Sequence, residues 1–160
     1  PAMNLFALNL VIAIGWAAVS GGFNGTNLLL GFAGGFLALY LTRPLFGDEQ
    51  PYFRRTFSAV GLLVFFIYEL VKSTAAVVWD VITPSTYARP RMIEMPLDCE
   101  DDTAIMLTAN LISLTPGTLT VDVLPDRSAL LIHAMFAEEP DEVVRDLKRG
   151  MERRVMEALR

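Results

Sequence analysis

MLTANLISLTPGTLTVDV, residues 106–123, is the stretch that decides how the second half of this chain folds. Its first part carries apolar side chains at helical spacing, including Leu107 and Leu111, until Pro116-Gly117 ends the pattern. Proline cannot continue a helix, and glycine adopts the conformations that come after one. From Thr118 apolar and polar residues alternate, which is typical of a half-buried strand. The stretch therefore predicts a helix, a tight stop and a strand.

The flanking segments complete a small α/β domain over residues 84–160. Alternation predicts strands at Arg91–Leu97 and Ala129–Phe136, and Pro140 opens a last helix. The apolar stripe of that helix is Val144, Leu147, Met151, Val155 and Leu159, and its solvated side is Arg145, Lys148, Arg149, Glu152 and Arg153. The order βαββα predicts a three-stranded sheet with two helices on one face, a truncated ferredoxin-like arrangement.

The front of the chain, residues 1–43, predicts a transmembrane helical hairpin. The first 42 residues contain no Asp, Glu, Lys, Arg or His, and two apolar runs, Met3–Val19 and Leu28–Leu41, flank a glycine-rich turn. Gly31 and Gly35 are four residues apart, as are Ala13 and Ala17. That spacing favours close helix packing in lipid, although membrane helices are rich in small residues in any case.

Residues 44–83 predict a loop, to Arg55, and a third membrane-associated helix, Phe57–Ile82. The first half of this helix is apolar all round. Its second half is amphipathic, with Glu69, Lys72 and Asp80 on one side. An acid and a lysine that pair on one face of a membrane segment are a candidate for ion or proton handling. The alternative, which we favour, is a salt bridge that tolerates an interfacial helix or docks a partner.

Two membrane topologies are compatible with the arginines. Arg43, Arg54 and Arg55 place the loop before the third helix in the cytoplasm by the positive-inside rule, and Arg89 and Arg91 do the same for its far end. Two spans followed by an interfacial third helix satisfy both groups. Three spans would instead place the first group outside. We expect the former arrangement, with the C-terminal domain cytoplasmic in a multi-pass protein of the inner (plasma) membrane.

Several function classes are disfavoured by composition. Residues 84–160 carry nine Lys/Arg and fourteen Asp/Glu, a net charge of −5, which repels nucleic acid. Phosphate-binding and dinucleotide-binding motifs are absent from the sequence. Cys99 is the only cysteine and predicts a small packed residue, whereas His133, the only histidine, predicts a half-exposed strand position. We expect no enzyme activity, catalytic residue, cofactor or bound metal.

The wording of the central stretch, from Thr108 to Leu119, resembles the signature of the E subunit of Mrp-type (Mnh/Pha) multisubunit Na+/H+ antiporters. Further matching segments are Tyr68–Ser73, Trp79–Ile82, Pro96–Asp98 and Leu131–Ala134. The similarity extends from about Pro44 to the end of the chain, with a matching hydrophobic start.

The resemblance implies a non-catalytic subunit that supports assembly and stability of a monovalent cation/proton antiporter. Its partners would be other membrane subunits and the lipid bilayer, and larger subunits would carry the ion path. Glu69, Lys72 and Asp80 are then the candidate docking or ion-pair face. The structural signature is Asn110, Thr115, Pro116, Gly117 and Thr118. A stand-alone, membrane-anchored regulatory or ligand-binding domain is the alternative.

Overall fold

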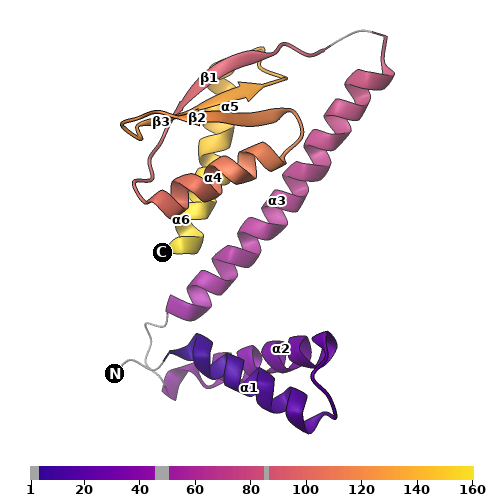
Figure 1. Ribbon diagram of the computed structural model, residues 1–160, viewed down its shortest axis with the longest axis vertical. Helices are drawn as coiled ribbons and strands as arrows, with labels where there is room; N and C mark the ends of the chain where they lie inside the picture. Colours follow the sequence, from indigo (N-terminus) through magenta and orange to yellow (C-terminus); the bar gives the residue numbers. More distant parts are fainter. Residues whose placement is uncertain (1–3, 46–50, 85–86) are drawn as a thin grey trace. The chain divides into compact units, whose positions relative to one another are not determined.

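The computed structural model describes residues 4–45, 51–84 and 87–160. The chain forms two compact units, Pro1–Arg54 and Arg55–Arg160, so the division falls inside the third helix. Most of that helix belongs to the same unit as the α/β elements, whereas the sequence groups it with the preceding loop. The first unit is helical, and the second combines helices with a three-stranded antiparallel sheet (Figure 1).

The first unit is built on a hairpin of α1 (Leu5–Val19) and α2 (Gly25–Leu41), followed by a short 3₁₀ turn, η1 (Arg43–Leu45). Asparagine side chains cap both helices: Asn4 accepts a hydrogen bond from the Ala7 amide, and Asn24 from the Asn27 amide. The second helix therefore begins three residues earlier than its apolar run, because the cap lies in the polar turn.

Small residues bring α1 and α2 together, as the predicted spacing requires. Ala13, Ala17, Gly31 and Gly35 are all buried. A Cβ atom on Gly31 would lie 2.8 Å from Trp16 Cβ, so only glycine permits this separation of the backbones. Close van der Waals contact of this kind stabilises the pair of helices.

The third helix, α3 (Pro51–Ile82), begins six residues before the predicted start at Phe57, so the predicted loop to Arg55 is wrong over its last residues. The rest of that loop, residues 46–50, lies outside the described part. The early start is explained by Tyr52 and Phe53, whose rings pack against Phe36 of α2. Tyr52 OH also accepts a 2.7 Å hydrogen bond from Asn9 Nδ2 in α1.

Among the described helices, α3 is the one long and apolar enough to cross a membrane, with 32 residues. The hairpin helices α1 and α2 are shorter, with 15 and 17 residues.

The sheet of the second unit contains β1 (Arg91–Pro96), β2 (Thr118–Val123) and β3 (Ala129–Ala134) in the order β1-β3-β2. Helix α4 (Asp102–Leu114) connects β1 to β2, and Asp101 caps it. Side chains of one sheet face, including Met95, Leu130 and Ile132, form a core with Ile105 and Ile112 of α4 and with Met151 and Val155. His133 lies exposed on the opposite face, and the predicted strand position is confirmed.

The last helix is not uniform. It consists of α5 (Pro140–Leu147), a π-helical turn η2 (Lys148–Glu152) and α6 (Arg153–Leu159). The prediction that Glu152 lies on the solvated side is wrong, because its side chain is fully buried. The wider turn admits one extra residue and rotates the remainder of the helix, so that Gly150, Met151 and Glu152 are buried in succession.

A pair of neighbouring glycines tests the hairpin contact. A Cβ atom on Gly35 would collide with Asn9 Oδ1 and lie 2.9 Å from Ile12 Cγ2, whereas one on Gly34 would meet nothing within 4 Å. Gly35→Ala should lower the stability of the full chain in detergent by about 1–3 kcal/mol through overpacking. Gly34→Ala should be neutral or slightly stabilising. Equal thermal unfolding midpoints for the two variants would contradict this packing.

Candidate functional site

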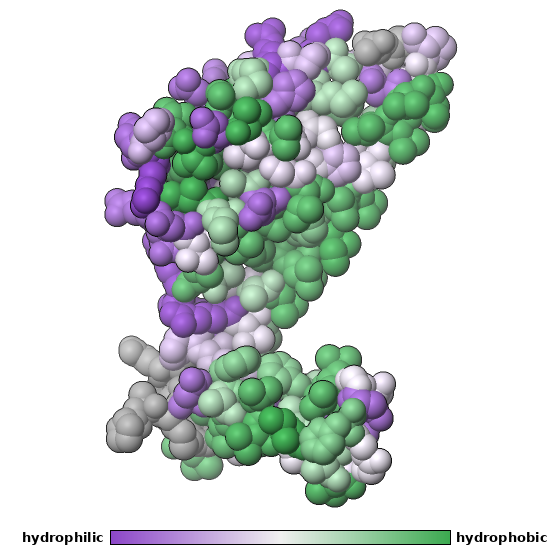
Figure 2. Space-filling view, in the orientation of Figure 1, coloured by the Kyte–Doolittle hydropathy of each residue, from purple (hydrophilic) through white to green (hydrophobic). Residues whose placement is uncertain are grey.

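Helix α3 exposes an apolar side, unlike a helix on the surface of a soluble protein. Its polar second-half residues Glu69, Ser73 and Asp80 are partly buried on the side that packs against the α/β elements. The opposite side is exposed and apolar, and Figure 2 shows it as a hydrophobic surface along α3. At least half of each of these side chains is exposed: Val60, Leu63, Val64, Ile67, Val71 and Val78. An apolar surface of this extent marks contact with lipid or with another protein.

Helix α3 packs onto the α/β core through its middle. Leu62 is part of the core, and Phe65 and Phe66 pack against it. The approach depends on Gly150 in the π turn, where a Cβ atom would lie 2.8 Å from the tip of the Phe65 ring. The Arg154 guanidinium then stacks 4.2 Å from the centre of the same ring, a cation–π contact.

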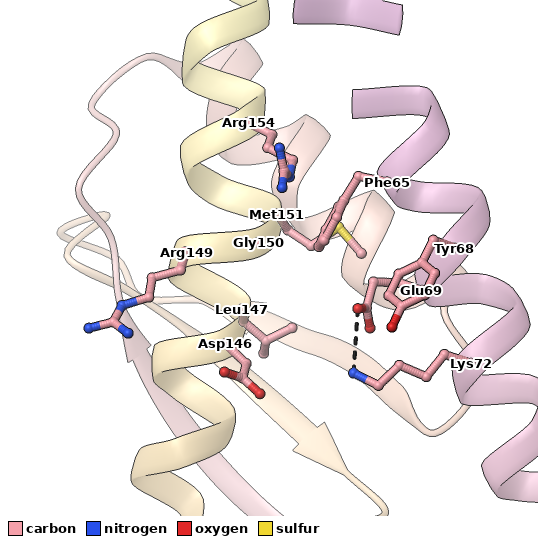
Figure 3. Close-up of a pocket in the computed structure, with 10 residues that line it drawn as sticks. All are labelled: Phe65, Tyr68, Glu69, Lys72, Asp146, Leu147, Arg149, Gly150, Met151 and Arg154. Atoms are coloured by element: carbon pink, nitrogen blue, oxygen red, sulfur yellow. Dashed lines mark hydrogen bonds and ion pairs between the residues drawn. The ribbon is translucent and has the colours of Figure 1, made fainter. Parts of the chain in front are cut away.

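Beside this contact, a pocket of about 390 Å³ opens between α3 and the last helix (Figure 3). Glu69 and Lys72 project into it from α3, and Lys72 Nζ lies 3.5 Å from Glu69 Oε1. The Lys72 and Glu69 side chains are 59% and 25% exposed, so the pair is weak in the chain itself. Asp146 and Arg154 contribute further charges from the last helix, while Arg149 is directed away from α3.

Asp80 does not join this pair. Its carboxylate Oδ1 accepts hydrogen bonds from the backbone amides of Tyr87 and Ala88, at 2.5 and 3.2 Å. It therefore ties the end of α3 to the chain that leads into β1. Of the three residues predicted to form one charged face, the structure brings together Glu69 and Lys72 only.

The stop after α4 is built from hydroxyl groups. Thr115 and Thr118 both donate to the Ile112 carbonyl oxygen, at 2.8 and 2.7 Å, and their own hydroxyl oxygens are 2.8 Å apart. Thr120 donates to the Ala109 carbonyl oxygen at 3.1 Å. Ile112 is one of the last four residues of α4, whose carbonyls have no i+4 partner within the helix, so Thr115 and Thr118 supply donors that this helix end requires. Thr120 adds a hydrogen bond to a carbonyl one turn earlier in the helix.

Ser113 extends this hydroxyl cluster into the strand. Its hydroxyl donates to the Ala109 carbonyl oxygen and accepts a 3.0 Å hydrogen bond from the Thr120 amide. Gly117, at φ 90°, makes the turn between helix and strand. Asn110 is exposed on α4 and takes no part in the cluster.

Glu152 is the buried carboxylate of the unit. Its Oε1 accepts hydrogen bonds from the backbone amides of Asp98 and Cys99, at 2.5 and 3.1 Å. Lys148 Nζ lies 3.6 Å from Oε2 and 2.7 Å from Asp98 Oδ1. Burial, reinforced by the Glu152 charge, raises the pKa of the Cys99 thiol to about 11. This arrangement fastens the π turn to the connection between β1 and α4.

Comparison with known proteins identifies the family of this chain. A family model described as Na+/H+ ion antiporter subunit matches residues 9–158. The chain belongs to this family. The E subunit of the Na+/H+ antiporter of Alkalihalophilus pseudofirmus is 31% identical over 150 residues, 94% of each chain. The corresponding E subunit of Bacillus subtilis is 31% identical over 153 residues, 96% of each chain.

A solved structure, the Mrp complex from Dietzia sp. DQ12-45-1b, contains a chain that is 25% identical to this antiporter subunit. The match covers 64% of this chain and 96% of that one, with a TM-score of 0.49.

Family membership confirms the resemblance drawn from residues 108–119 and the subunit function predicted from it. The chain is a membrane component of an antiporter rather than a stand-alone anchored domain. The members of this family are components of a transporter. The exposed apolar side of α3 is consistent with such a component, because a membrane subunit contacts lipid or other subunits.

The burial of Glu152 and the π turn could not be predicted from the sequence. The charged neighbours Lys148 and Arg153 favour a solvated Glu152, and no local signal announces a π turn. The hydroxyl cluster does leave a signal, since Ser113, Thr115, Thr118 and Thr120 surround the Pro-Gly stop. Their short side chains favour backbone hydrogen bonds at helix ends and turns.

Gly117 allows a test of the turn. Its positive φ is poorly accessible to residues with a Cβ, while a Cβ would meet Phe136 only at 3.5 Å. Gly117→Val should therefore cost roughly 1–3 kcal/mol through backbone strain rather than collision. Gly117→Asn should cost less, because asparagine tolerates left-handed conformations. Thermal unfolding of the full chain in detergent measures both, and a valine variant as stable as the glycine parent would exclude a strained turn.

Proposed function

We propose that this chain is a supporting subunit of an Mrp-type antiporter complex, contributing to assembly and stability without an ion path of its own. The exposed apolar side of α3, opposite the side that packs on the α/β core, carries the proposal. In water this apolar surface would promote aggregation, so it supports a position in contact with lipid and other membrane subunits. The ion path belongs to other subunits in this proposal, because the charged pair Glu69/Lys72 supplies too few groups to cross a bilayer core about 30 Å thick.

We assign the two membrane spans to α1 and α2 and place α3 at the inner interface. The hairpin helices are close to the lower limit of about 17 residues for a span. Helix α3 is long enough to cross, but its middle packs on the α/β core through Leu62 and Phe65. A helix that lies along the interface can keep that packing and still bury its apolar side in lipid.

The same proposal treats the α/β elements as a cytoplasmic domain. Strand order β1-β3-β2, with α4 and the last helix packed on one face, supports a ferredoxin-like arrangement that lacks the fourth strand. Arg43 and Arg89, which flank α3 on its two sides, support a cytoplasmic location for both of its ends.

Cysteine labelling tests the topology. Single cysteines at Asp126 and at Asp48, which lies outside the described residues, would be introduced in a Cys99→Ser background. We expect both positions to react with an impermeant maleimide from the cytoplasmic side only, in everted but not in intact vesicles. Reaction from opposite sides would require three spans and overturn the interfacial placement of α3.

The Glu69/Lys72 pair tests the supporting role. If a partner subunit buries the pair on assembly, Glu69→Gln leaves Lys72 unpaired, at a cost of about 3–5 kcal/mol. The amount of assembled complex on a native gel should then fall, while Na+/H+ exchange per assembled complex stays near normal. Glu69→Gln combined with Lys72→Gln should restore assembly at least partly, since no unpaired charge remains.

A direct role in proton transfer makes the opposite prediction. Glu69→Gln would then leave assembly normal and abolish exchange in everted vesicles, and the double variant would not recover it. Asp141→Asn, which removes an exposed carboxylate from the first turn of α5, serves as the control for a simple change in net charge.

A further inference from the structure

The face of the sheet that the helices leave uncovered carries apolar side chains. Helix α4 and the last helix pack on the other face (Figure 1). An antiparallel sheet with one solvated face normally alternates apolar residues inward with polar residues outward. Here Met92 of β1 and Leu119 of β2 alternate with the core residues of their strands, and their side chains are 51% and 52% exposed.

The pairing register makes these side chains neighbours. His133 on the central strand β3 lies opposite Met92 on one side and opposite Leu119 on the other. Residues directly opposite each other on a sheet face are about 4.5–5.5 Å apart between their Cβ atoms. Leu131 lies two residues away from His133 on the same face and is partly exposed. We call Met92, Leu119, Leu131 and His133 the outer sheet patch. Contiguous exposed apolar residues, unlike single ones, mark interaction sites.

Negative charge lies beside the outer sheet patch. Leu131 is opposite Glu94 on β1 and opposite Asp122 on β2, and both acidic residues are exposed. The one arginine within the three strands, Arg91, belongs to the other face by alternation. Arg127, in the turn between β2 and β3, is paired with a carboxylate of α4. A partner that fits this surface therefore combines apolar side chains with positive charge.

The β2 edge of the sheet is closed to a further strand. The Thr118 amide donates to the Thr115 carbonyl oxygen at 3.2 Å, and the Thr120 amide donates to the Ser113 hydroxyl at 3.0 Å. A bulge at Val121 then interrupts the strand. Since these amides are already used and bulges hinder pairing, a partner strand cannot extend the sheet here.

The β1 edge is protected as well. The Leu97 amide donates to the Ser128 carbonyl oxygen directly opposite, so the even-numbered residues of β1 direct their backbone groups away from β3. Pro90 and Pro96 occupy two of these outward positions and have no N–H. The Pro96 carbonyl oxygen accepts a 2.7 Å hydrogen bond from Lys148 Nζ. Prolines and charged side chains at a sheet edge prevent strand addition, so a partner has to lie on the face.

We propose that the outer sheet patch binds a cytoplasmic segment of another antiporter subunit, one that carries apolar side chains together with Lys or Arg. Cytoplasmic loops of membrane proteins are rich in Lys and Arg, which complement Glu94 and Asp122. A second copy of this chain would bring the same acids together. The cytoplasmic membrane surface is itself negative and repels them. The proposal rests on the cytoplasmic location of the α/β elements proposed above.

Photo-crosslinking in the intact complex tests the occupant. p-Benzoylphenylalanine is incorporated in place of Leu119 and, as the control, in place of Met106, which is 60% exposed on α4 at the other face of the sheet. Membranes that contain the whole antiporter are irradiated, and mass spectrometry identifies the cross-linked peptides. We expect position 119 to cross-link to a Lys- or Arg-containing cytoplasmic segment of another subunit, and position 106 not to reach that segment.

A charge series examines the complementarity. Glu94→Lys should reduce co-purification of the cross-linked subunit about tenfold, because like charges would then face each other. Glu94→Gln should reduce it less. Asp141→Lys makes the same change in net charge as Glu94→Lys on α5, which packs on the other face, and should leave co-purification unchanged. Circular dichroism and thermal unfolding of the full chain in detergent show that each variant is folded.

Three results would overturn the proposal. These are a cross-link from position 119 to a second copy or to lipid, no cross-link from position 119 in an assembled complex, and equal losses for Glu94→Lys and Asp141→Lys. A complex that assembles on a native gel without the cross-link would overturn this surface and leave the supporting role standing. A chain found outside any complex would overturn both.

Discussion

The contact of α3 with the α/β core is the interaction on which the rest of the second unit depends. Leu62, Phe65 and Phe66 use one side of the helix, which leaves the apolar opposite side without any cover from the described part of the unit. Covering it in water would require a further layer of protein. In the proposed arrangement a bilayer or neighbouring membrane subunits provide that layer, so the fold and the proposed membrane contact of this antiporter subunit depend on the same helix.

Glycine determines how closely the helices approach in both units. In the hairpin, Gly31 and Gly35 remove side chains that would hold α1 and α2 apart. In the second unit, Gly150 does the same between α3 and the π turn, where the Phe65 ring fills the space. The wider turn that presents Gly150 also directs Glu152 inward, so the approach of α3 and the fastening of the last helix share one local irregularity.

Local chemistry explains which parts of the fold were predictable. Pro116-Gly117 and the alternation after Thr118 are properties of adjacent residues, and the helix, stop and strand occur where they indicate. The start of α3 and the burial of Glu152 depend on residues far away in sequence: the rings packed on Tyr52 and Phe53, and the amides of Asp98 and Cys99. The pairing of Glu69 with Lys72 could be predicted from their i, i+3 spacing. The hydrogen bonds that Asp80 accepts could not, because the donor amides lie seven and eight residues further along the chain.

The burial of Cys99 has a consequence for the chemistry of its thiol. With a thiol pKa of about 11, the reactive thiolate at pH 8 amounts to roughly one molecule in a thousand, and the protein covers the sulfur. Peroxide, disulfides and alkylating agents act on exposed thiolate, and this chain has no other cysteine. The Cys99 thiol of the folded chain should therefore react slowly with oxidants and alkylating agents.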